Sequence, residues 1–599
     1  MRFLKNFLIF LFTVFLCFNL FAESKPSANE VFAFYSACAK GDLKVASSFL
    51  NKFPDCANIE LFQDIVKVEG YDNIAYANFA NYLLATEIAT PFDDEDAEQK
   101  WIKNYKRYPI NIATIYGHTE IVKLLIQYNA NLELCEENGL TPLMRAAYKN
   151  QKEIVSLLFE NNAATNTKSN EGFTAFMYAV NSGNLDIVKL LFSKSNINEK
   201  SNKGATSLII ASDLNYTDIA VFLINNGAYV NEKMNTGDSA LLYASKNGNN
   251  EIVNLLIKKN CDVNVYNNNG TTPLMSACYN GYLEIVSMLV RNKANINVKD
   301  KNGLTPLMYA VLNNHPNIVS CLLDKNAEIN EKTISGETAL MLAVYYQFPE
   351  IVSLLIKYGA NVNERNNSLN SSLGFAVQQN SPELISILLN NNADINLTIQ
   401  QDMTVIYFAC AHGWTDAVRE LLKYNPDLTV TCFDNITPFC AAAVYGHTDV
   451  LELLMGKDAD LIGDYKLLAK DISGALIEKH PESVCTILSN KKYARMFFKF
   501  PGTFKIDDFT LLMWAAREGY VDLARILLEN KVDVDYQNEE GVTALILATY
   551  NNNFEIVKLL VEAGADVNLK DKYGNKAINY STLHKENPDL FFYLYPFEE

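Results

Sequence analysis

The chain has 599 residues, 49% of them hydrophobic, which is too long for one compact domain and predicts either several domains or a solenoid. Its formal net charge is −18, from 69 acidic and 51 basic residues. A nucleic-acid binder needs a basic face that neutralises phosphates, so this balance argues against nucleic acid as a partner. We interpret the acidity as a source of solubility, with a basic partner as the alternative.

The first 22 residues are predicted to be a signal peptide. Arg2 and Lys5 give a basic start, residues 7–18 form a short apolar run, and Ala22 precedes a polar segment. The run is shorter than the roughly 20 residues that a membrane span needs. We therefore expect a periplasmic or secreted protein, exported from a bacterial cytoplasm. Because Leu20 is larger than the residue usual at that position, an uncleaved leader that tethers the chain to a membrane is the alternative.

Residues 23–104 are expected to form an N-terminal cap and a divergent repeat. The segment from Ala37 to Asp42 matches half of a repeat unit that recurs further along the chain. The acidic run at 93–96 is expected to lie in an inserted loop. It lacks the glycine and the spaced ligands of an EF-hand, so we interpret it as a solvated loop rather than a calcium site.

A repeat with a period of about 33 residues runs through residues 105–460, in a register set by the near-identical segments 138–143, 269–274 and 302–307. A typical unit has a Thr-Pro-Leu turn, a short helix with small residues, and a loop glycine that tolerates a left-handed conformation. A second helix follows, with apolar residues at helical spacing. The unit closes on an asparagine that we expect to cap its own backbone: Asn198, Asn231, Asn264, Asn297, Asn330, Asn363 and Asn396.

These motifs resemble the ankyrin repeat. The resemblance implies an all-α solenoid of helix–turn–helix units joined by short β-hairpin-like loops, right through the mature chain. One position departs from the family, which usually has a histidine after Thr-Pro-Leu that ties adjacent turns by hydrogen bonds. We expect apolar packing to replace those bonds, because several units of this chain have methionine there, among them Met144, Met275, Met308, Met341 and Met513.

Residues 461–507 are predicted to be a degenerate repeat with an insertion. With Leu468 in register, Ile472 and Ala475 fall on the apolar and small positions, and Pro481 falls at the start of the second helix. About seven extra residues within 491–505 are basic and aromatic, which we interpret as a distorted repeat edge. Contact with anionic lipid or a partner is the alternative. Residues 508–599 are expected to hold the C-terminal repeats and an aromatic cap at 591–595.

Motifs of catalytic or ligand-binding chemistry are absent from the sequence, which has no P-loop, GxGxxG, GxSxG or HExxH pattern. The histidines are dispersed, and His118 and His447 fall in the turn between two helices, which predicts a structural role. The cysteines after the leader lack metal-binding or disulfide spacing, and Cys38, Cys278 and Cys410 are expected to be buried in place of alanine. We predict no catalytic site, cofactor, metal or small-molecule substrate.

A candidate partner surface follows from the resemblance, because the first helices and hairpin tips line the concave face of ankyrin-like folds. Aromatic residues recur just before the conserved alanine of the first helix and three residues after that position. Such rings give large contact area at low entropy cost. The predicted partner-binding residues are Tyr148, Tyr178, Tyr243, Tyr279, Tyr309, Tyr345, Phe375, Phe408, Trp514 and Tyr550. The alternative is that these rings only pack between neighbouring first helices.

The sequence therefore predicts a monomeric protein–protein interaction scaffold whose partner is a protein of unknown identity. One alternative is a membrane-tethered or host-surface interaction protein, with membrane contact only if the leader is retained. Another is an enzyme with its site in the irregular segments 57–104 or 461–507. Those segments are short for a catalytic domain and lack paired acid–base residues.

Overall fold

The computed structural model describes residues 28–58, 108–136, 138–399, 403–432, 436–457, 465–499, 505–506, 508–584 and 586–597. The predicted signal peptide, the acidic run at 93–96 and nearly all of segment 57–104 lie outside these residues. Contacts divide the chain into two units, Met1–Leu322 and Leu323–Glu599. Within the described residues, both units consist of helices with only isolated β-bridges between them, which confirms the predicted all-α fold.

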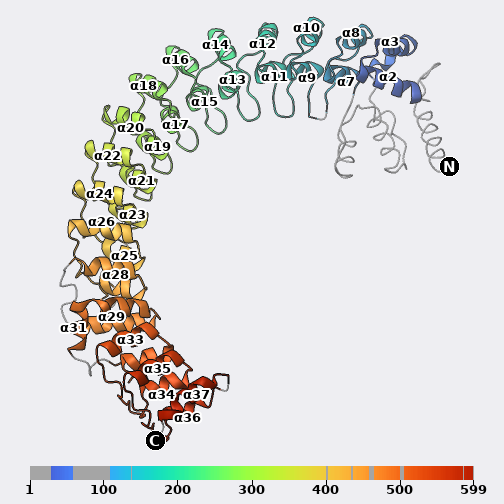
Figure 1. Ribbon diagram of the computed structural model, residues 1–599. Coiled ribbons are helices and arrows are strands. Elements are labelled where there is room, and N and C mark those ends of the chain that lie inside the picture. Colours follow the sequence, from blue (N-terminus) through green and yellow to red (C-terminus); the bar gives the residue numbers. More distant parts are fainter. Residues whose placement is uncertain are drawn as a thin grey trace, which may run out of the picture. The chain divides into compact units, whose positions relative to one another are not determined.

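In the first unit the helices come in pairs, which we call the first and second helix of a repeat (Figure 1). The pairs are α2 (Ala28–Lys40) and α3 (Leu43–Lys52), α7 (Pro109–Ile115) and α8 (Thr119–Gln127), α9 (Pro142–Tyr148) and α10 (Lys152–Glu160), α11 (Ala175–Asn181) and α12 (Leu185–Phe192), α13 (Ser207–Asp213) and α14 (Thr217–Asn225), α15 (Ala240–Asn247) and α16 (Asn250–Lys258), α17 (Pro273–Asn280) and α18 (Leu283–Arg291), and α19 (Pro306–Leu312) and α20 (Pro316–Leu323). A 3-10 turn, η2 (Pro54–Asn58), follows α3.

The second unit continues the same arrangement. Its pairs are α21 (Ala339–Tyr345) and α22 (Pro349–Lys357), α23 (Ser372–Gln378) and α24 (Pro382–Asn390), α25 (Val405–Ala411) and α26 (Thr415–Leu421), α27 (Pro438–Val444) and α28 (Thr448–Met455), α29 (Tyr465–Ile477) and α30 (Pro481–Ser489), α32 (Leu511–Glu518) and α33 (Val521–Glu529), α34 (Ala544–Tyr550) and α35 (Phe554–Glu562), and α36 (Ala577–Ser581) and α37 (Pro588–Leu594). Further short elements are η4 (Leu422–Tyr424), α31 (Lys491–Phe498) and η5 (Tyr595–Phe597).

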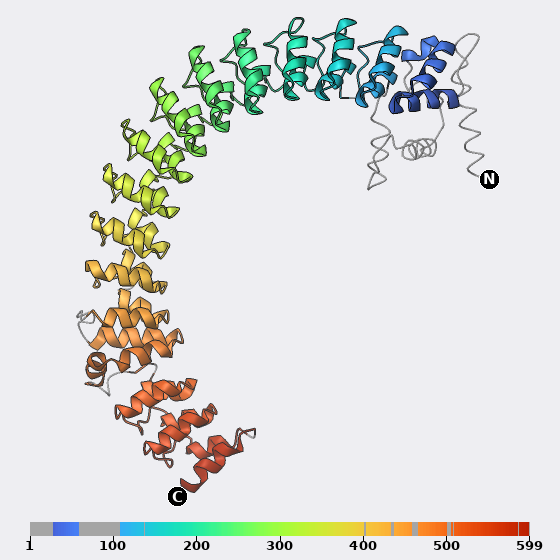
Figure 2. The same ribbon diagram turned by 45° about the horizontal axis from the view of Figure 1, so that its top comes forward.

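The short first helices begin at a capping threonine in most repeats. The Thr141 hydroxyl accepts the backbone N–H of Met144 at 3.3 Å, and Thr272 does the same for Met275 at 3.2 Å, which satisfies a donor that the helix itself leaves unpaired. Typical helices have seven to nine residues, too few to persist alone in water. Their stability therefore comes from stacking between neighbouring repeats, which Figure 2 shows within each unit.

The methionines that replace the family histidine lie in the core. Met144, Met275, Met308, Met341 and Met513 are each at most 1% exposed, which confirms apolar packing at this position. The side chains of Cys38, Cys278 and Cys410 are fully buried as predicted, and this burial raises the pKa of each thiol far above its usual range. Thiols of this kind are poor nucleophiles, so these cysteines serve as packing residues.

The asparagine that closes each repeat bonds to the following repeat, so the prediction that it caps its own backbone is wrong. In the first unit, the Asn198 side chain accepts the Tyr229 N–H at 2.8 Å and donates to the Gly227 carbonyl. The residue two positions earlier makes the local cap, as Asn196 does for the Asn198 N–H at 3.1 Å. Asn363 of the second unit follows the same pattern, so these residues link repeats.

The degenerate repeat folds as predicted at its register positions. Leu468, Ile472 and Ala475 are fully buried in α29, and Pro481 begins α30. The basic and aromatic extra residues form α31, an additional helix that contacts both α29 and α30 within the second unit (Figure 1). Tyr493 and Phe497 are buried on its inner side, while Lys491, Lys492, Arg495 and Lys499 are exposed.

Candidate interaction surface

The predicted aromatic residues fall into two groups that differ in exposure. At the C-terminal ends of first helices, the side chains are open to solvent: Tyr148 is 45% exposed, Tyr279 43%, Tyr345 49% and Tyr550 53%. The residues just before the conserved alanine are half-buried, as in Tyr243, Tyr309, Phe375, Phe408 and Trp514. Tyr178, which was predicted to contact a partner, is only 9% exposed, so its ring is buried rather than open to solvent.

Each exposed tyrosine packs edge-on against an aromatic ring of the following repeat. In the first unit, the ring centroids of Tyr148 and Tyr178 are 5.8 Å apart at 79°, and those of Tyr279 and Tyr309 are 6.1 Å apart at 80°. In the second unit the pairs are Tyr345 with Phe375 at 5.7 Å and Tyr550 with Tyr580 at 5.6 Å. This T-shaped geometry is favourable and restricts the exposed ring to few orientations. We call these four pairs the aromatic dyads.

Where the inner ring of a dyad is a tyrosine, its hydroxyl bonds to the hairpin of its own repeat. Tyr178 donates its hydroxyl hydrogen to the Ser169 hydroxyl at 3.2 Å, and Tyr309 donates to the Asp300 carboxylate at 2.9 Å. Burial and the Asp300 bond raise the pKa of Tyr309 to about 12. Tyr580 donates to Asp571 in the same way. These three tyrosines therefore brace the hairpin nine positions earlier and also pack against the preceding repeat, so structural contacts account for them in part.

The remaining predicted residues also have partners within their repeats. The Tyr243 hydroxyl donates to the Met234 sulfur at 3.8 Å. Phe408 packs against the rings of His412 and Trp414, at centroid distances of 4.3 Å and 5.3 Å. Trp514 donates its indole N–H to the Ile506 carbonyl at 3.3 Å, and the Arg517 guanidinium lies over its ring at 4.0 Å.

Sequence reasoning missed some residues of this surface. Tyr580 completes the last dyad. It was not predicted because it precedes Ser581, whereas the residue at that position in the preceding repeats is alanine. Tyr116, Tyr346 and Tyr445 are 42% to 55% exposed at the turn after a first helix. The sequence pattern that could have found them is an aromatic residue directly before the loop glycine. In one repeat, Gln347 takes the place of that glycine after Tyr346.

The histidines in the inter-helix turn contact the preceding repeat. Nε2 of His118 bonds to the Ala39 carbonyl at 2.7 Å, and Nε2 of His447 bonds to the Ala411 carbonyl at 3.0 Å. Their predicted structural role is therefore confirmed. Within the described part of the chain, no group of three or more His, Cys, Asp or Glu side chains is placed to hold a metal ion.

Comparison with known proteins agrees with the repeat architecture. A family model of ankyrin repeats, built of three copies, matches residues 72–169, 161–234, 230–300, 289–366, 373–462 and 474–590. A segment of 78 residues is 45% identical to ankyrin repeat and SAM domain-containing protein 6 of Mus musculus, covering 13% of this chain and 9% of that protein.

Two further relatives match segments of similar length. One is an ankyrin repeat-containing protein of Treponema pallidum (strain Nichols), 35% identical over 78 residues, which are 13% of this chain and 26% of that protein. The other is the RelA-associated inhibitor of Mus musculus, 37% identical over 70 residues, which are 12% of this chain and 8% of that protein. The matches thus span only a small part of each relative. Because the ankyrin family model matches most of its length, the chain belongs to the ankyrin repeat family.

Proposed function

We propose that this protein is a protein–protein interaction scaffold whose partner contacts the aromatic dyads. Ankyrin repeat arrays are typical of protein–protein interaction, and the RelA-associated inhibitor is named for an association of its own. The observation that carries the proposal is the exposure of Tyr148, Tyr279, Tyr345 and Tyr550 on the first helices. A ring already held edge-on by its neighbour loses little freedom on binding, so more of its contact energy contributes to affinity.

Replacing the exposed ring of each dyad is expected to weaken partner binding and leave the fold intact. Tyr148→Ala with Tyr279→Ala tests the first unit, and Tyr345→Ala with Tyr550→Ala tests the second. Hot-spot tyrosines contribute on the order of 1–2 kcal/mol each, so affinity should fall at least roughly tenfold in the unit that binds. The measurement is affinity capture with the wild-type chain, identification of the retained proteins, and titration of the purified partner against each variant.

The matched control is Tyr229→Ala with Tyr595→Ala, because these tyrosines are 62% and 61% exposed and lie after α14 and in η5, outside both the first helices and the hairpin tips. This control should retain the partner at wild-type affinity. Tyr309 is unsuitable for the test because its hydroxyl bond to Asp300 braces the hairpin. If both dyad variants bind the partner as tightly as the control does, the proposed surface is wrong.

We further propose that the chain is exported and acts in the periplasm or outside the cell. The support is the basic start, short apolar run and Ala22 of the leader. In the described residues, no helix has the length and apolar character needed to cross a membrane. We expect N-terminal sequencing of the protein from its native source to begin at Glu23. A chain that keeps Met1 and sediments with membranes would instead support the tethered alternative.

A further inference from the structure

Neighbouring hairpins are tied by a recurring ion pair between a lysine and a glutamate of the next hairpin. In the first unit Lys168 pairs with Glu199 at 2.5 Å, and Lys200 pairs with Glu232; in the second unit Lys332 pairs with Glu364 at 2.7 Å. The glutamate stands 31 or 32 positions after its lysine. These three hairpin lysines therefore each have a carboxylate of the chain itself within reach.

The row is interrupted at Lys233. The position 32 residues further on, where a glutamate would stand, is Val265, which is buried. Lys233 donates to the Tyr266 carbonyl at 3.2 Å, as Lys168 and Lys332 donate to the carbonyl of the next hairpin, but in place of a glutamate it has the exposed Tyr266 ring, 5.0 Å away at the centroid. A carbonyl and a ring face satisfy part of the ammonium's bonding but leave its charge without a carboxylate. Lys233 itself is exposed.

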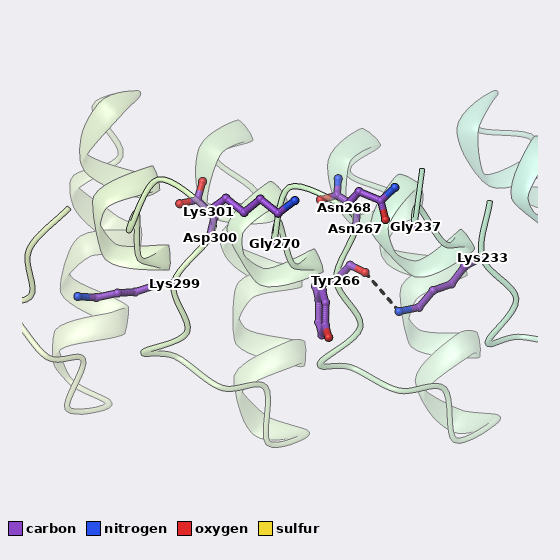
Figure 3. A pocket seen from close by; sticks show the side chains of 9 residues that line it. All are labelled: Lys233, Gly237, Tyr266, Asn267, Asn268, Gly270, Lys299, Asp300 and Lys301. Atoms are coloured by element: carbon purple, nitrogen blue, oxygen red, sulfur yellow. Dashed lines mark hydrogen bonds between the residues drawn. The ribbon is translucent and has the colours of Figure 1, made fainter. Parts of the chain in front are cut away.

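A groove of about 490 Å³ opens at this interruption (Figure 3). Three successive hairpins of the first unit line it, with Lys233, Lys299 and Lys301 as its cations and Asp300 as its acidic residue. Lys233 and Lys301 extend toward the middle hairpin from opposite sides, whereas Lys299 extends away from it.

The acidic residue of the groove is already engaged. Asp300 is 7% exposed, accepts the Tyr309 hydroxyl at 2.9 Å, and accepts the N–H groups of Asn302 and Leu304 in its own turn. It therefore braces the hairpin rather than neutralising Lys233 or Lys301. The groove is a local positive site on a chain of net charge −18, which favours an anionic ligand.

We propose that this groove binds an acidic peptide segment of the protein partner, whose carboxylates pair with Lys233 and Lys301. The inference rests on the proposed function, since it names the chemistry of the same partner. Carboxylates are the anions that the equivalent lysines, Lys200 and Lys332, already bind within the chain. The partner's carboxylate thus takes the role that Glu232 and Glu364 have in other repeats. Electrostatic pairing of this kind sets specificity and association rate, and it weakens with salt.

The test uses the full chain and a fluorescein-labelled hexaglutamate peptide, with hexaglutamine as the neutral probe, followed by fluorescence anisotropy. Hexaglutamate is expected to bind and hexaglutamine not to bind. Lys233→Glu with Lys301→Glu should raise the Kd at least about tenfold. Val265→Glu should also weaken binding, because it supplies Lys233 with the carboxylate that other repeats have. Circular dichroism verifies that each variant is folded.

The matched control is Lys258→Glu with Lys259→Glu, which makes the same charge change on exposed lysines at the end of α16. The Kd of this control for hexaglutamate should stay within about twofold of the wild-type value, because the change in net charge alone has a small effect. Equal weakening in both double variants would overturn the proposal, as would equal binding of the two peptides. Displacement by inorganic phosphate more effectively than by acetate at equal ionic strength would overturn the assignment to carboxylates.

The test separates this inference from the proposed function. The dyad variants, Tyr148→Ala with Tyr279→Ala, should bind hexaglutamate as the wild type does. If hexaglutamate fails to bind while the dyad variants still lose the captured partner, the groove assignment is wrong and the scaffold stands. If hexaglutamate binds while the dyad variants keep the partner, the groove is supported and the aromatic surface is not.

Discussion

Replacing Asp471 with asparagine is expected to stabilise the protein above about pH 7 and to leave its stability unchanged below about pH 4. Asp471 lies in α29 of the degenerate repeat and is only 3% exposed. Burial raises its pKa from 3.8 to about 7, although a hydrogen bond with the Cys440 thiol and the charge of Lys470 act in the opposite direction. An ionised carboxylate is costly in such surroundings, so the folded chain keeps the proton.

The sign of this pH dependence follows from proton binding. The unfolded chain ionises Asp471 above pH 3.8, whereas the folded chain holds the proton until about pH 7. The stability that the raised pKa provides is complete below pH 3.8 and is lost as pH rises through about 7. The resulting loss in the free energy of unfolding, from below pH 3.8 to above about pH 7, is on the order of 4 kcal/mol. Asparagine keeps the shape of the neutral carboxyl and does not ionise, so the variant should lack this loss.

Urea unfolding at about pH 5 and about pH 8 measures the difference, together with amide hydrogen exchange in α29. Exchange is included because a repeat array can open one repeat at a time. The control is Asp449→Asn, an exposed aspartate of the adjacent repeat, for which the change should stay within about 1 kcal/mol at either pH. If Asp471→Asn and wild type show the same loss of stability from pH 5 to pH 8, the buried carboxyl is ionised throughout.

Replacing Gly172 with alanine is expected to destabilise the hairpin that joins two repeats of the first unit. Gly172 has φ +78°, and an added Cβ would lie 2.6 Å from the backbone nitrogen of Asn202 in the next hairpin. That nitrogen donates to the Glu171 carbonyl at 3.0 Å, so moving it breaks a bond between repeats. The left-handed conformation costs roughly 1–2 kcal/mol for alanine. The overlap adds about 1–3 kcal/mol.

Gly227→Ala separates these two causes. Gly227 has φ +90°, but a Cβ there meets nothing within 4 Å. This control should therefore show only the conformational cost, roughly 1–2 kcal/mol. Urea unfolding gives the total loss, and amide exchange at Asn202 reports the bond between the hairpins. Equal destabilisation by the two substitutions would mean that the next hairpin moves away from the added Cβ with no loss of folding free energy.

Much of the fold follows from the sequence because one pattern recurs. The 33-residue register alone placed Met275 and Cys278 in the core, and it located Pro481 at the start of α30 in a repeat with little other similarity. The two core positions depend on contacts between adjacent repeats that every unit makes alike. Periodicity therefore predicts such positions even where individual residues vary.

The pairing of side chains could not be predicted in this way. The bond of Asn198 to Tyr229 joins atoms 31 residues apart, and nothing in one repeat reveals it. The dyad of Tyr279 and Tyr309 likewise depends on an angle between rings in two repeats. The sequence showed α31 as basic and aromatic, but only its packing shows which rings face inward. Candidate surfaces chosen by register alone thus mix exposed rings with rings such as Tyr178 that brace a hairpin.

The buried methionine row has a chemical consequence. A thioether oxidises to a polar sulfoxide that a packed core does not accommodate. Met144, Met275, Met308, Met341 and Met513 are shielded from an oxidant while their repeats are closed. Each belongs to a different repeat, so a sulfoxide at one of them marks the opening of that repeat alone. Once formed, it hinders the repeat from closing until the thioether is restored by reduction. In an oxidising environment, the array would accumulate damage according to how often each of its repeats opens.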